Sequence, residues 1–275
     1  MRTVRGQMEK VNWHSRDGTE VTGYLFLPKK RGPFPVVIYL HGGLHASALR
    51  DVIPRAGNEA CRRYIMKRGY AILMVDYRGS TGYGESYLKL DDWGGREVDD
   101  VLGAVKYLEE TGIAKPHHIF LYGNSRGAFI GLWALERTDK FTAAALSNGF
   151  FNLFDIITGK IPVPDCRLRD LMEAIRSLAG DGEKRLLIEC WRRSPLFYVE
   201  KVNANVLIIG SEADEVIPLG CALEVKTALE AAGKHVALKI FTGAGANHTF
   251  IEHGEPVKDA LTAWGIILDF FDGKK

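Results

Sequence analysis

Seven short apolar runs constrain the fold of this 275-residue chain more than any other feature. They have the length and the β-branched or aromatic content of strands, and they cover residues 21–28, 35–41, 70–77, 118–123, 143–148, 205–210 and 236–241. Most are apolar on both faces, as in a mostly parallel sheet covered by helices on each side. Amphipathic segments alternate with them, at 58–69, 96–111, 219–233 and 256–271. The pattern predicts one α/β domain spanning residues 1–275, with about eight strands and helices on both faces.

One segment interrupts this alternation. Residues 149–202 replace the short crossover expected between two parallel strands, and they include a helical-looking stretch at 167–180. Long insertions of this kind often form lids over functional sites. We therefore expect residues 149–202 to form a small cap or lid within the domain.

Composition excludes several classes of function. The formal net charge is +2, from 36 basic and 34 acidic residues, so no basic surface indicates nucleic-acid binding. No apolar stretch approaches the roughly 20 residues of a membrane span, and the N-terminus does not read as a signal peptide, so we expect a cytoplasmic protein without membrane contact. The cysteines form no CxxC pair and the histidines have no ligand spacing, so we expect reduced, packed thiols and no metal. The cysteines are Cys61, Cys166, Cys190 and Cys221.

The stretch YGNSRGA, at 122–128, places Ser125 between a predicted buried strand and a predicted helix. Gly123 and Gly127 would let the chain turn sharply there and let the helix pack closely. A serine at this corner also lies at a helix N-terminus, which favours developing negative charge. The pattern predicts that Ser125 is a nucleophile, and the alternative is a simple helix N-cap.

A serine nucleophile needs a base, and the base needs an acid to orient it. In the hydrolase order these follow the last two strands of the sheet. Asp214 follows the sixth apolar run, with Glu212 and Glu215 as rivals in the same loop. His248 lies in the glycine-rich loop after the seventh run, and His253 is its rival nearer the final helix. We predict Asp214 as the acid and His248 as the base.

Backbone donors for an oxyanion are expected near the end of an early strand. The stretch PVVIYLHGGLH supplies Gly42 and Gly43, whose lack of side chains would let the backbone approach a reacting carbonyl. The amide of Arg126, directly after the serine, would be the second donor. The sequence leaves open which of Gly42 and Gly43 donates, and an ordinary turn is the alternative.

Longer motifs carry a family resemblance. They are DYRGSTGYGESY at 76–87, WGGREVDDVLGAVKYL at 93–108, SPLFYVEKVNANVLIIG at 194–210 and DEVIP at 214–218. With the motifs above, which together span roughly residues 20–270, they resemble the catalytic domain of the prolyl oligopeptidase family, which includes acylaminoacyl peptidases and dipeptidyl peptidases. The resemblance implies the α/β-hydrolase fold, with Ser125, Asp214 and His248 as nucleophile, acid and base and with no cofactor.

The resemblance also bears on which class of substrate we expect. Peptidases of that family usually carry an N-terminal β-propeller, whereas here we expect the hydrolase domain to stand alone. HGGL lacks the proline of many relatives, and GNSRGA ends in alanine where a second glycine is common. These changes weaken the expectation of peptide specificity. Because a hydrolase domain without a propeller has an open site and esters have good leaving groups, we expect a carboxylesterase acting on small or medium acyl esters. A small peptidase, cleaving acylaminoacyl peptides or dipeptides, is the alternative, and a non-catalytic ligand receptor on the same scaffold is a third reading.

Aromatic residues of the insertion are candidates for the acyl or leaving-group pocket, and ordinary core packing is their alternative role. They are Phe150, Phe151, Phe154 and Trp191. We expect Arg78, in the YRG segment, to be a structural ion-pair residue rather than a substrate contact. A small ester or short peptide is the expected binding partner, and a homo-oligomer is compatible with this fold.

Overall fold

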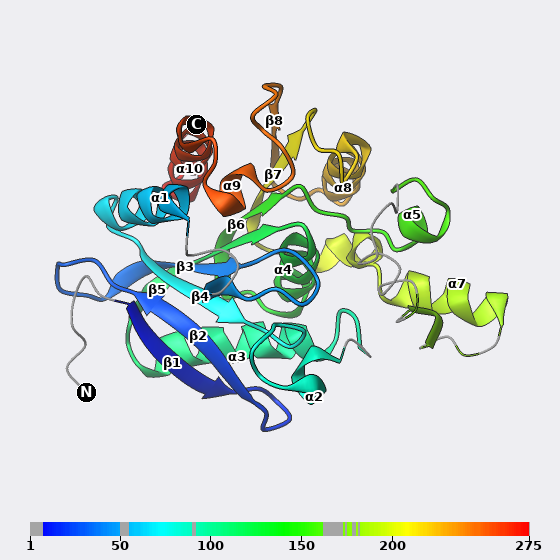
Figure 1. The fold of residues 1–275 in the computed structure, drawn as a ribbon, viewed down its shortest axis with the longest axis horizontal. Coiled ribbons are helices and arrows are strands. Elements are labelled where there is room, and N and C mark those ends of the chain that lie inside the picture. The colour runs from blue at the N-terminus through cyan, green and yellow to red at the C-terminus, as the bar shows by residue number, and fades with distance from the viewer. Residues whose placement is uncertain are drawn as a thin grey trace.

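The computed structural model describes residues 8–49, 55–89, 92–161, 173, 175–177, 180 and 182–274. Its centre is one eight-stranded sheet in the order β1-β2-β4-β3-β5-β6-β7-β8 (Figure 1). The strands are β1 (Met8–His14), β2 (Glu20–Phe26), β3 (Phe34–Leu40), β4 (Ala71–Asp76), β5 (Ala114–Asn124), β6 (Phe141–Ser147), β7 (Asn205–Ser211) and β8 (Val236–Phe241). From β4 to β8 every neighbouring pair is parallel, while β1 and β2 join the sheet antiparallel. The predicted mostly parallel sheet of about eight strands is confirmed.

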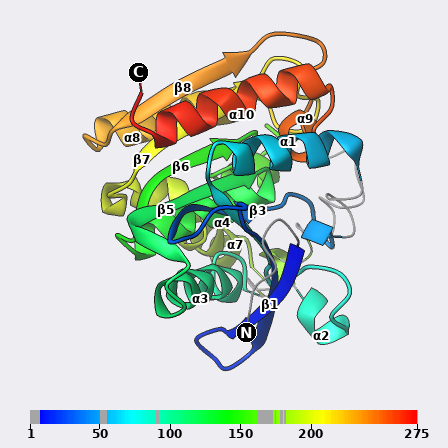
Figure 2. The same ribbon diagram turned by 90° about the vertical axis from the view of Figure 1, so that its left-hand side faces the viewer.

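Helices cover both faces of the sheet (Figure 2). They are α1 (Ala56–Lys67), α2 (Glu85–Leu88), α3 (Arg96–Glu110), α4 (Arg126–Arg137), α5 (Phe154–Ile157), α7 (Glu183–Arg192), η2 (Pro195–Lys201), α8 (Leu219–Ala231), α9 (Phe250–His253) and α10 (Val257–Phe271). Strand β3 shows how the faces divide: Val36 and Ile38 pack in the core beneath α3, α4 and α8, whereas Val37 and Tyr39 pack beneath α1 and α10. Because both faces are buried, the strand is apolar throughout.

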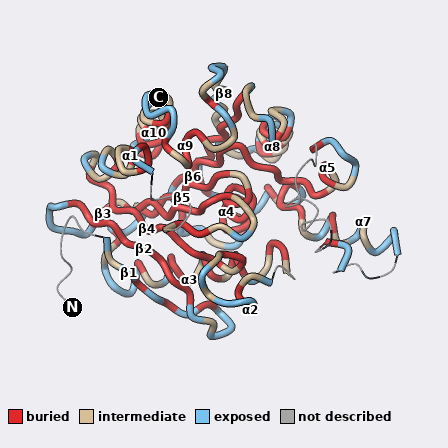
Figure 3. Tube along the Cα trace, viewed as in Figure 1, coloured by how far each residue is buried: buried red, intermediate tan, exposed pale blue. Residues whose placement is uncertain are grey.

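The antiparallel edge strand β1 was not among the strands expected from the sequence. Its residues MEKVNWH alternate polar and apolar side chains, and only Val11 and Trp13 are buried. A half-exposed edge strand lacks the continuous apolar run that marked the others. Strand β5 likewise begins at Ala114, ahead of the predicted start at 118, and the three residues after Ala114 are exposed, so they lack the apolar pattern of a buried strand. Figure 3 shows the buried centre of the sheet.

The segment 149–202 is described only in part. The ends of the segment belong to the main body, since Phe151 accepts a hydrogen bond from the Leu196 amide at 3.1 Å and η2 packs against α4. Helix α7 lies at the periphery, and Cys190 is its one buried residue (Figure 1). Most of the helix expected at 167–180 lies outside the described residues.

Three of the four cysteines lie within the described residues, and all three are buried and free, as predicted. Burial raises the pKa of Cys61 and Cys221 to about 12 and that of Cys190 to about 11, so each stays a protonated thiol. Cys166 lies outside the described residues. Over the part of the chain that the structure describes, no helix is both long and apolar enough to cross a bilayer.

Candidate active site

Ser125 occupies a strained corner between β5 and α4. Its backbone has φ +52° and ψ −118°, a conformation that residues other than glycine rarely adopt. A Cβ atom on Gly123 would lie 2.3 Å from the Gly127 carbonyl oxygen, and one on Gly127 would lie 2.3 Å from the Leu40 carbonyl oxygen. Both glycines are therefore required for the helix to pack this close to the sheet.

The corner leaves Ser125 available for chemistry. The Ser125 amide donates to the Ser147 carbonyl at 2.9 Å, which fixes the backbone at the end of the sheet. The side chain is partly exposed, and its hydroxyl makes no hydrogen bond to another described residue. The amide of Arg126, in the first turn of α4, has no acceptor among the described residues either, so it is free to donate to a bound anion.

His248 and Asp214 form a tight pair in the loops that follow the carboxyl ends of β8 and β7. Their Nδ1 and Oδ2 atoms lie 2.8 Å apart, and the carboxylate is only 1% exposed. The other oxygen of Asp214 accepts the amides of Val216 and Ile217, each at 2.8 Å. The carboxylate is therefore fully engaged and held in one orientation, which in turn orients the imidazole ring.

Polar contacts tie the His248 loop to the strand that carries the serine and to the strand beside it. The His248 carbonyl accepts from Asn148 at 3.0 Å and from Asn124 at 3.4 Å. The Ser211 hydroxyl, at the end of β7, donates to the Ala246 carbonyl. Asn124 directly precedes Ser125, so the loops carrying the three predicted catalytic residues converge at the carboxyl ends of β5 to β8.

Among the described residues, none of the rivals named from the sequence takes part in the pair that Asp214 forms with His248. Glu212 and Glu215 are exposed to solvent. His253 lies at the end of α9, where burial lowers its pKa, and it makes no ion pair with a described carboxylate. Among the described residues, the structure therefore brings Asp214 together with His248 and with none of the other candidates.

The backbone amides of Gly42 and Gly43 differ in their hydrogen bonding. A Cβ atom on Gly42 would lie 3.2 Å from the Ser125 Cβ atom, so this segment borders the serine. The Gly42 amide donates to the side chain of Glu252, and it is therefore already engaged. The Gly43 amide has no acceptor among the described residues, and the residue has φ +77°. Within the part of the chain that the structure describes, the Gly43 amide is therefore the one of the two that lacks an acceptor.

Sequence reasoning missed Glu252 and the asparagines that hold the His248 loop. Glu252 is only 4% exposed and directly follows the apolar residues Phe250 and Ile251. A carboxylate among buried residues was the available signal, because such groups are rarely buried without polar partners. The partners themselves come from distant parts of the chain.

The predicted pocket aromatics divide into two pairs. Phe150 and Phe151 are buried in the core, and Phe150 stacks on Phe129 with ring centroids 5.2 Å apart. Phe154 is partly exposed and Trp191 is 50% exposed, and both contact Phe197. Only the second pair offers surface to a ligand.

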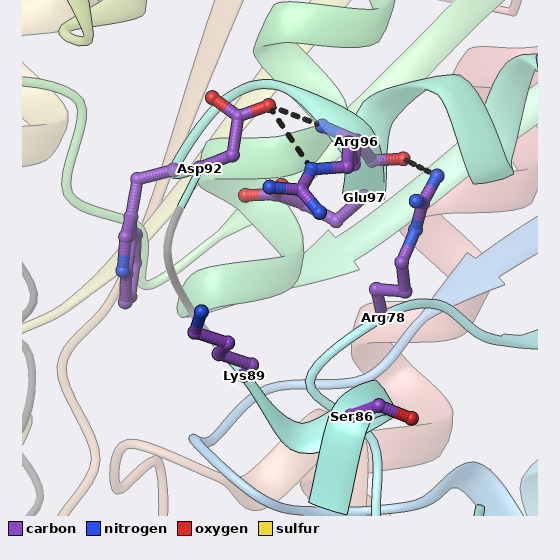
Figure 4. A pocket seen from close by; sticks show the side chains of 7 residues that line it. Arg78, Ser86, Lys89, Asp92, Arg96 and Glu97 are labelled. Atoms are coloured by element: carbon purple, nitrogen blue, oxygen red, sulfur yellow. Dashed lines mark hydrogen bonds and ion pairs between the residues drawn. The ribbon is translucent and has the colours of Figure 1, made fainter. Parts of the chain in front are cut away.

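Arg78 has the structural role expected from the sequence. Its guanidinium bonds the buried Asp100 at 2.7 Å, and it also reaches Asp17, Ser15 and the Arg96 carbonyl. The hollow beside it contains further charged side chains. Figure 4 shows the Asp92 carboxylate joined to the amide and the guanidinium of Arg96, and Arg78 joined to the Arg96 carbonyl. Its lining residues are Arg78, Ser86, Lys89, Asp92, Trp93, Arg96 and Glu97.

Comparisons with known proteins identify the family of the chain. A family model described as the prolyl oligopeptidase family matches residues 60–272, and one described as esterase FrsA-like matches residues 1–111. An uncharacterised peptidase of Bacillus subtilis is 28% identical over 96% of this chain and 38% of its own length. The human acylamino-acid-releasing enzyme is 28% identical over 78% of this chain and 29% of its own length.

Solved structures share the fold. The acylaminoacyl peptidase of Pyrococcus horikoshii is 24% identical, with a TM-score of 0.76 over 98% of this chain and 42% of that protein. A puromycin-hydrolysing peptidase of Mycobacterium tuberculosis is also 24% identical, with a TM-score of 0.80 over 98% of this chain and 40% of that protein. The chain thus spans about two-fifths or less of the length of these relatives. Since the first family model spans well over half of the chain, the chain belongs to the prolyl oligopeptidase family of serine hydrolases.

Proposed function

We propose that this protein hydrolyses acyl bonds through an acyl-enzyme intermediate on Ser125. The observation that carries the proposal is the buried Asp214 carboxylate paired with His248 at the sheet edge where the strained Ser125 corner lies. The strained backbone of Ser125, between Gly123 and Gly127, costs free energy, and a serine with a purely structural role would not need such strain. The non-catalytic receptor reading gains no support from a site in which the acid, the base and the corner are all present.

The proposed reaction has two half-reactions. His248 Nε2 takes the proton of Ser125 as the serine oxygen attacks the acyl carbonyl, and Asp214 stabilises the imidazolium that forms. The amides of Gly43 and Arg126 donate to the oxyanion of the tetrahedral intermediate. His248 then gives its proton to the leaving alcohol or amine, and water attacks the acyl-enzyme in the same way to release the acid and regenerate Ser125.

Small or medium acyl esters are the substrates we propose first. Alkoxide leaving groups depart more readily than amide nitrogen, and the esterase-like model over residues 1–111 supports this reading. A short acylated peptide is the second candidate, and the peptidase names of the relatives favour it. In either case the described part of the 149–202 insertion would supply Phe154 and Trp191 to the substrate pocket, as part of a cap.

Comparing two substrates tests the proposal. We would measure kcat/KM on p-nitrophenyl butyrate and on N-acetylalanyl p-nitroanilide, with Ser125→Ala as the control variant. Strong ester cleavage that the substitution abolishes supports the esterase, and comparable anilide cleavage supports a peptidase. Activity that survives in Ser125→Ala on both substrates, or a wild-type protein that ignores a fluorophosphonate probe, would overturn the mechanism.

The pocket has its own test. Trp191→Ala should change the ratio of kcat/KM between p-nitrophenyl acetate and p-nitrophenyl octanoate by roughly tenfold, because it removes a half-exposed ring worth about 1 to 2 kcal/mol of apolar contact. Phe150→Leu, which alters a core ring, is the matched variant and should change stability rather than that ratio. An unchanged ratio in Trp191→Ala would remove the residue from the pocket.

A further inference from the structure

Glu252 joins three segments of the candidate active site. It lies in α9, four residues after His248. Its Oε1 atom accepts the Gly42 amide, and its Oε2 atom accepts the Asn124 side-chain amide at 3.1 Å. One side chain thus contacts the oxyanion segment, the residue before the nucleophile and, through its own helix, the loop of the base.

Burying the Glu252 carboxylate costs free energy of desolvation, which its hydrogen bonds must offset. Glu252 is 4% exposed, and no described lysine, arginine or histidine forms an ion pair with it. A buried carboxylate without a cation depends on N–H donors to offset its desolvation. The donors here are the Gly42 amide and the Asn124 side-chain amide, and both belong to segments that border Ser125. The groups that offset the desolvation of Glu252 therefore lie at the candidate active site.

Close packing makes the position of Gly42 sensitive to Glu252. A Cβ atom on Gly42 would lie 3.0 Å from Glu252 Oε2 and 3.2 Å from the Asn124 carbonyl oxygen. Gly42 therefore sits between the carboxylate and the serine corner with little free space. Because the carboxylate holds the Gly42 amide, the following amide, that of Gly43, is the one of the two without an acceptor among the described residues.

We propose that Glu252 is a positioning residue that fixes the oxyanion segment against the Ser125 corner and assigns the oxyanion contact to the Gly43 amide. It touches no reacting atom, and it acts through Gly42 and Asn124. This inference rests on the proposed function, because it concerns the transition state of the Ser125 reaction.

Substitution of Glu252 should lower kcat without weakening substrate binding. Loss of one oxyanion donor costs about 100- to 1,000-fold in kcat, and a donor displaced by about 1 Å costs up to about 100-fold. We therefore expect Glu252→Leu to lower kcat on p-nitrophenyl butyrate about 10- to 100-fold. Glu252→Gln keeps the shape and one acceptor, but its NH₂ group faces an N–H donor, so a loss of about 3- to 10-fold is expected.

The experiment measures kcat per active site, KM, the inhibition constant of butylboronic acid and the melting temperature for wild type, both Glu252 variants and Glu255→Gln. The boronic acid forms a tetrahedral adduct on the serine, so its inhibition constant should rise by the same factor as kcat falls, with KM changed less than about twofold. Glu255 is exposed, and its variant should match wild type. If Glu252→Leu does not fold, Glu252→Gln supplies the same comparison.

Two results would overturn the inference alone, and a third would overturn it together with the proposed function. A lowered melting temperature with unchanged kcat and boronate inhibition would show that Glu252 only stabilises the fold. A higher kcat in Glu252→Leu would show that the carboxylate obstructs the site. A wild type inert to both ester and fluorophosphonate would instead refute the proposed function and this inference with it.

Discussion

Replacing Asp214 by asparagine should lower kcat about 10,000-fold while leaving the fold intact. The reason lies in how the loop holds this side chain. Oδ1 accepts two amides, those of Val216 and Ile217, and Oδ2 faces His248 Nδ1 at 2.8 Å. In the variant the amide oxygen stays on the two backbone donors, because turning the group over would lose both hydrogen bonds, at about 1 kcal/mol each.

The consequence is a wrong imidazole tautomer. With the asparagine NH₂ group facing His248, Nδ1 must accept a hydrogen bond, and the ring proton moves to Nε2. An Nε2 that carries a proton cannot take one from Ser125. The equivalent change in another serine hydrolase lowers kcat about 10⁴-fold, which corresponds to roughly 5 kcal/mol of transition-state stabilisation.

The assay compares kcat/KM on p-nitrophenyl butyrate for Asp214→Asn with that for Glu212→Gln and Glu215→Gln, the exposed carboxylates of the same loop. Both controls should retain wild-type activity. The melting temperature of Asp214→Asn should stay within a few degrees of wild type, because the contacts of its oxygen with the loop are kept. Activity above about a tenth of wild type in Asp214→Asn, or a large loss in either control, would refute the assignment of the acid.

Three further predictions concern the frame around the site. Gly127→Ala should lower the free energy of unfolding by at least about 3 kcal/mol in urea, because its Cβ would lie 2.3 Å from the Leu40 carbonyl oxygen. Gly220→Ala, with open space around it, is the control and should be neutral or stabilising. Equal effects of the two substitutions would contradict the close approach of α4 to the sheet. Arg78→Ala should lower the free energy of unfolding by about 3 to 5 kcal/mol, because it leaves the buried Asp100 carboxylate without its cation. A loss of kcat/KM at unchanged melting temperature would instead indicate that Arg78 contacts the substrate. Burial raises the pKa of Glu136 to about 9, so the folded state holds a proton that the unfolded state releases near pH 4.5, and stability should fall as pH rises between these values. Glu136→Gln should therefore gain stability over wild type from about pH 5.5 to about pH 8.5 in urea unfolding, and a constant difference would contradict the raised pKa.

Local patterns predicted the strands that are buried on both faces and the candidate catalytic residues that follow them. Apolar runs predict strands buried on both faces, and the order of Ser125, Asp214 and His248 along the chain follows the order of the strands that carry them. The half-polar edge strand β1 was missed, since its pattern depends on being covered on one face only. The pairing of Asp214 with His248 was a prediction from chain order, and the 2.8 Å contact supplies the geometry that such a prediction needs.

The sequence by itself determined the seven apolar strands and the candidate residues that follow three of them, because strand and helix patterns depend on neighbours a few positions away. Only the tertiary structure distinguishes the Gly42 amide from the Gly43 amide, since the distinction depends on a hydrogen bond from Gly42 to Glu252, 210 positions along the chain. The same holds for Phe150, whose burial against α4 depends on how the sheet and helices pack. A contact between distant residues is created by packing, and no local pattern encodes it.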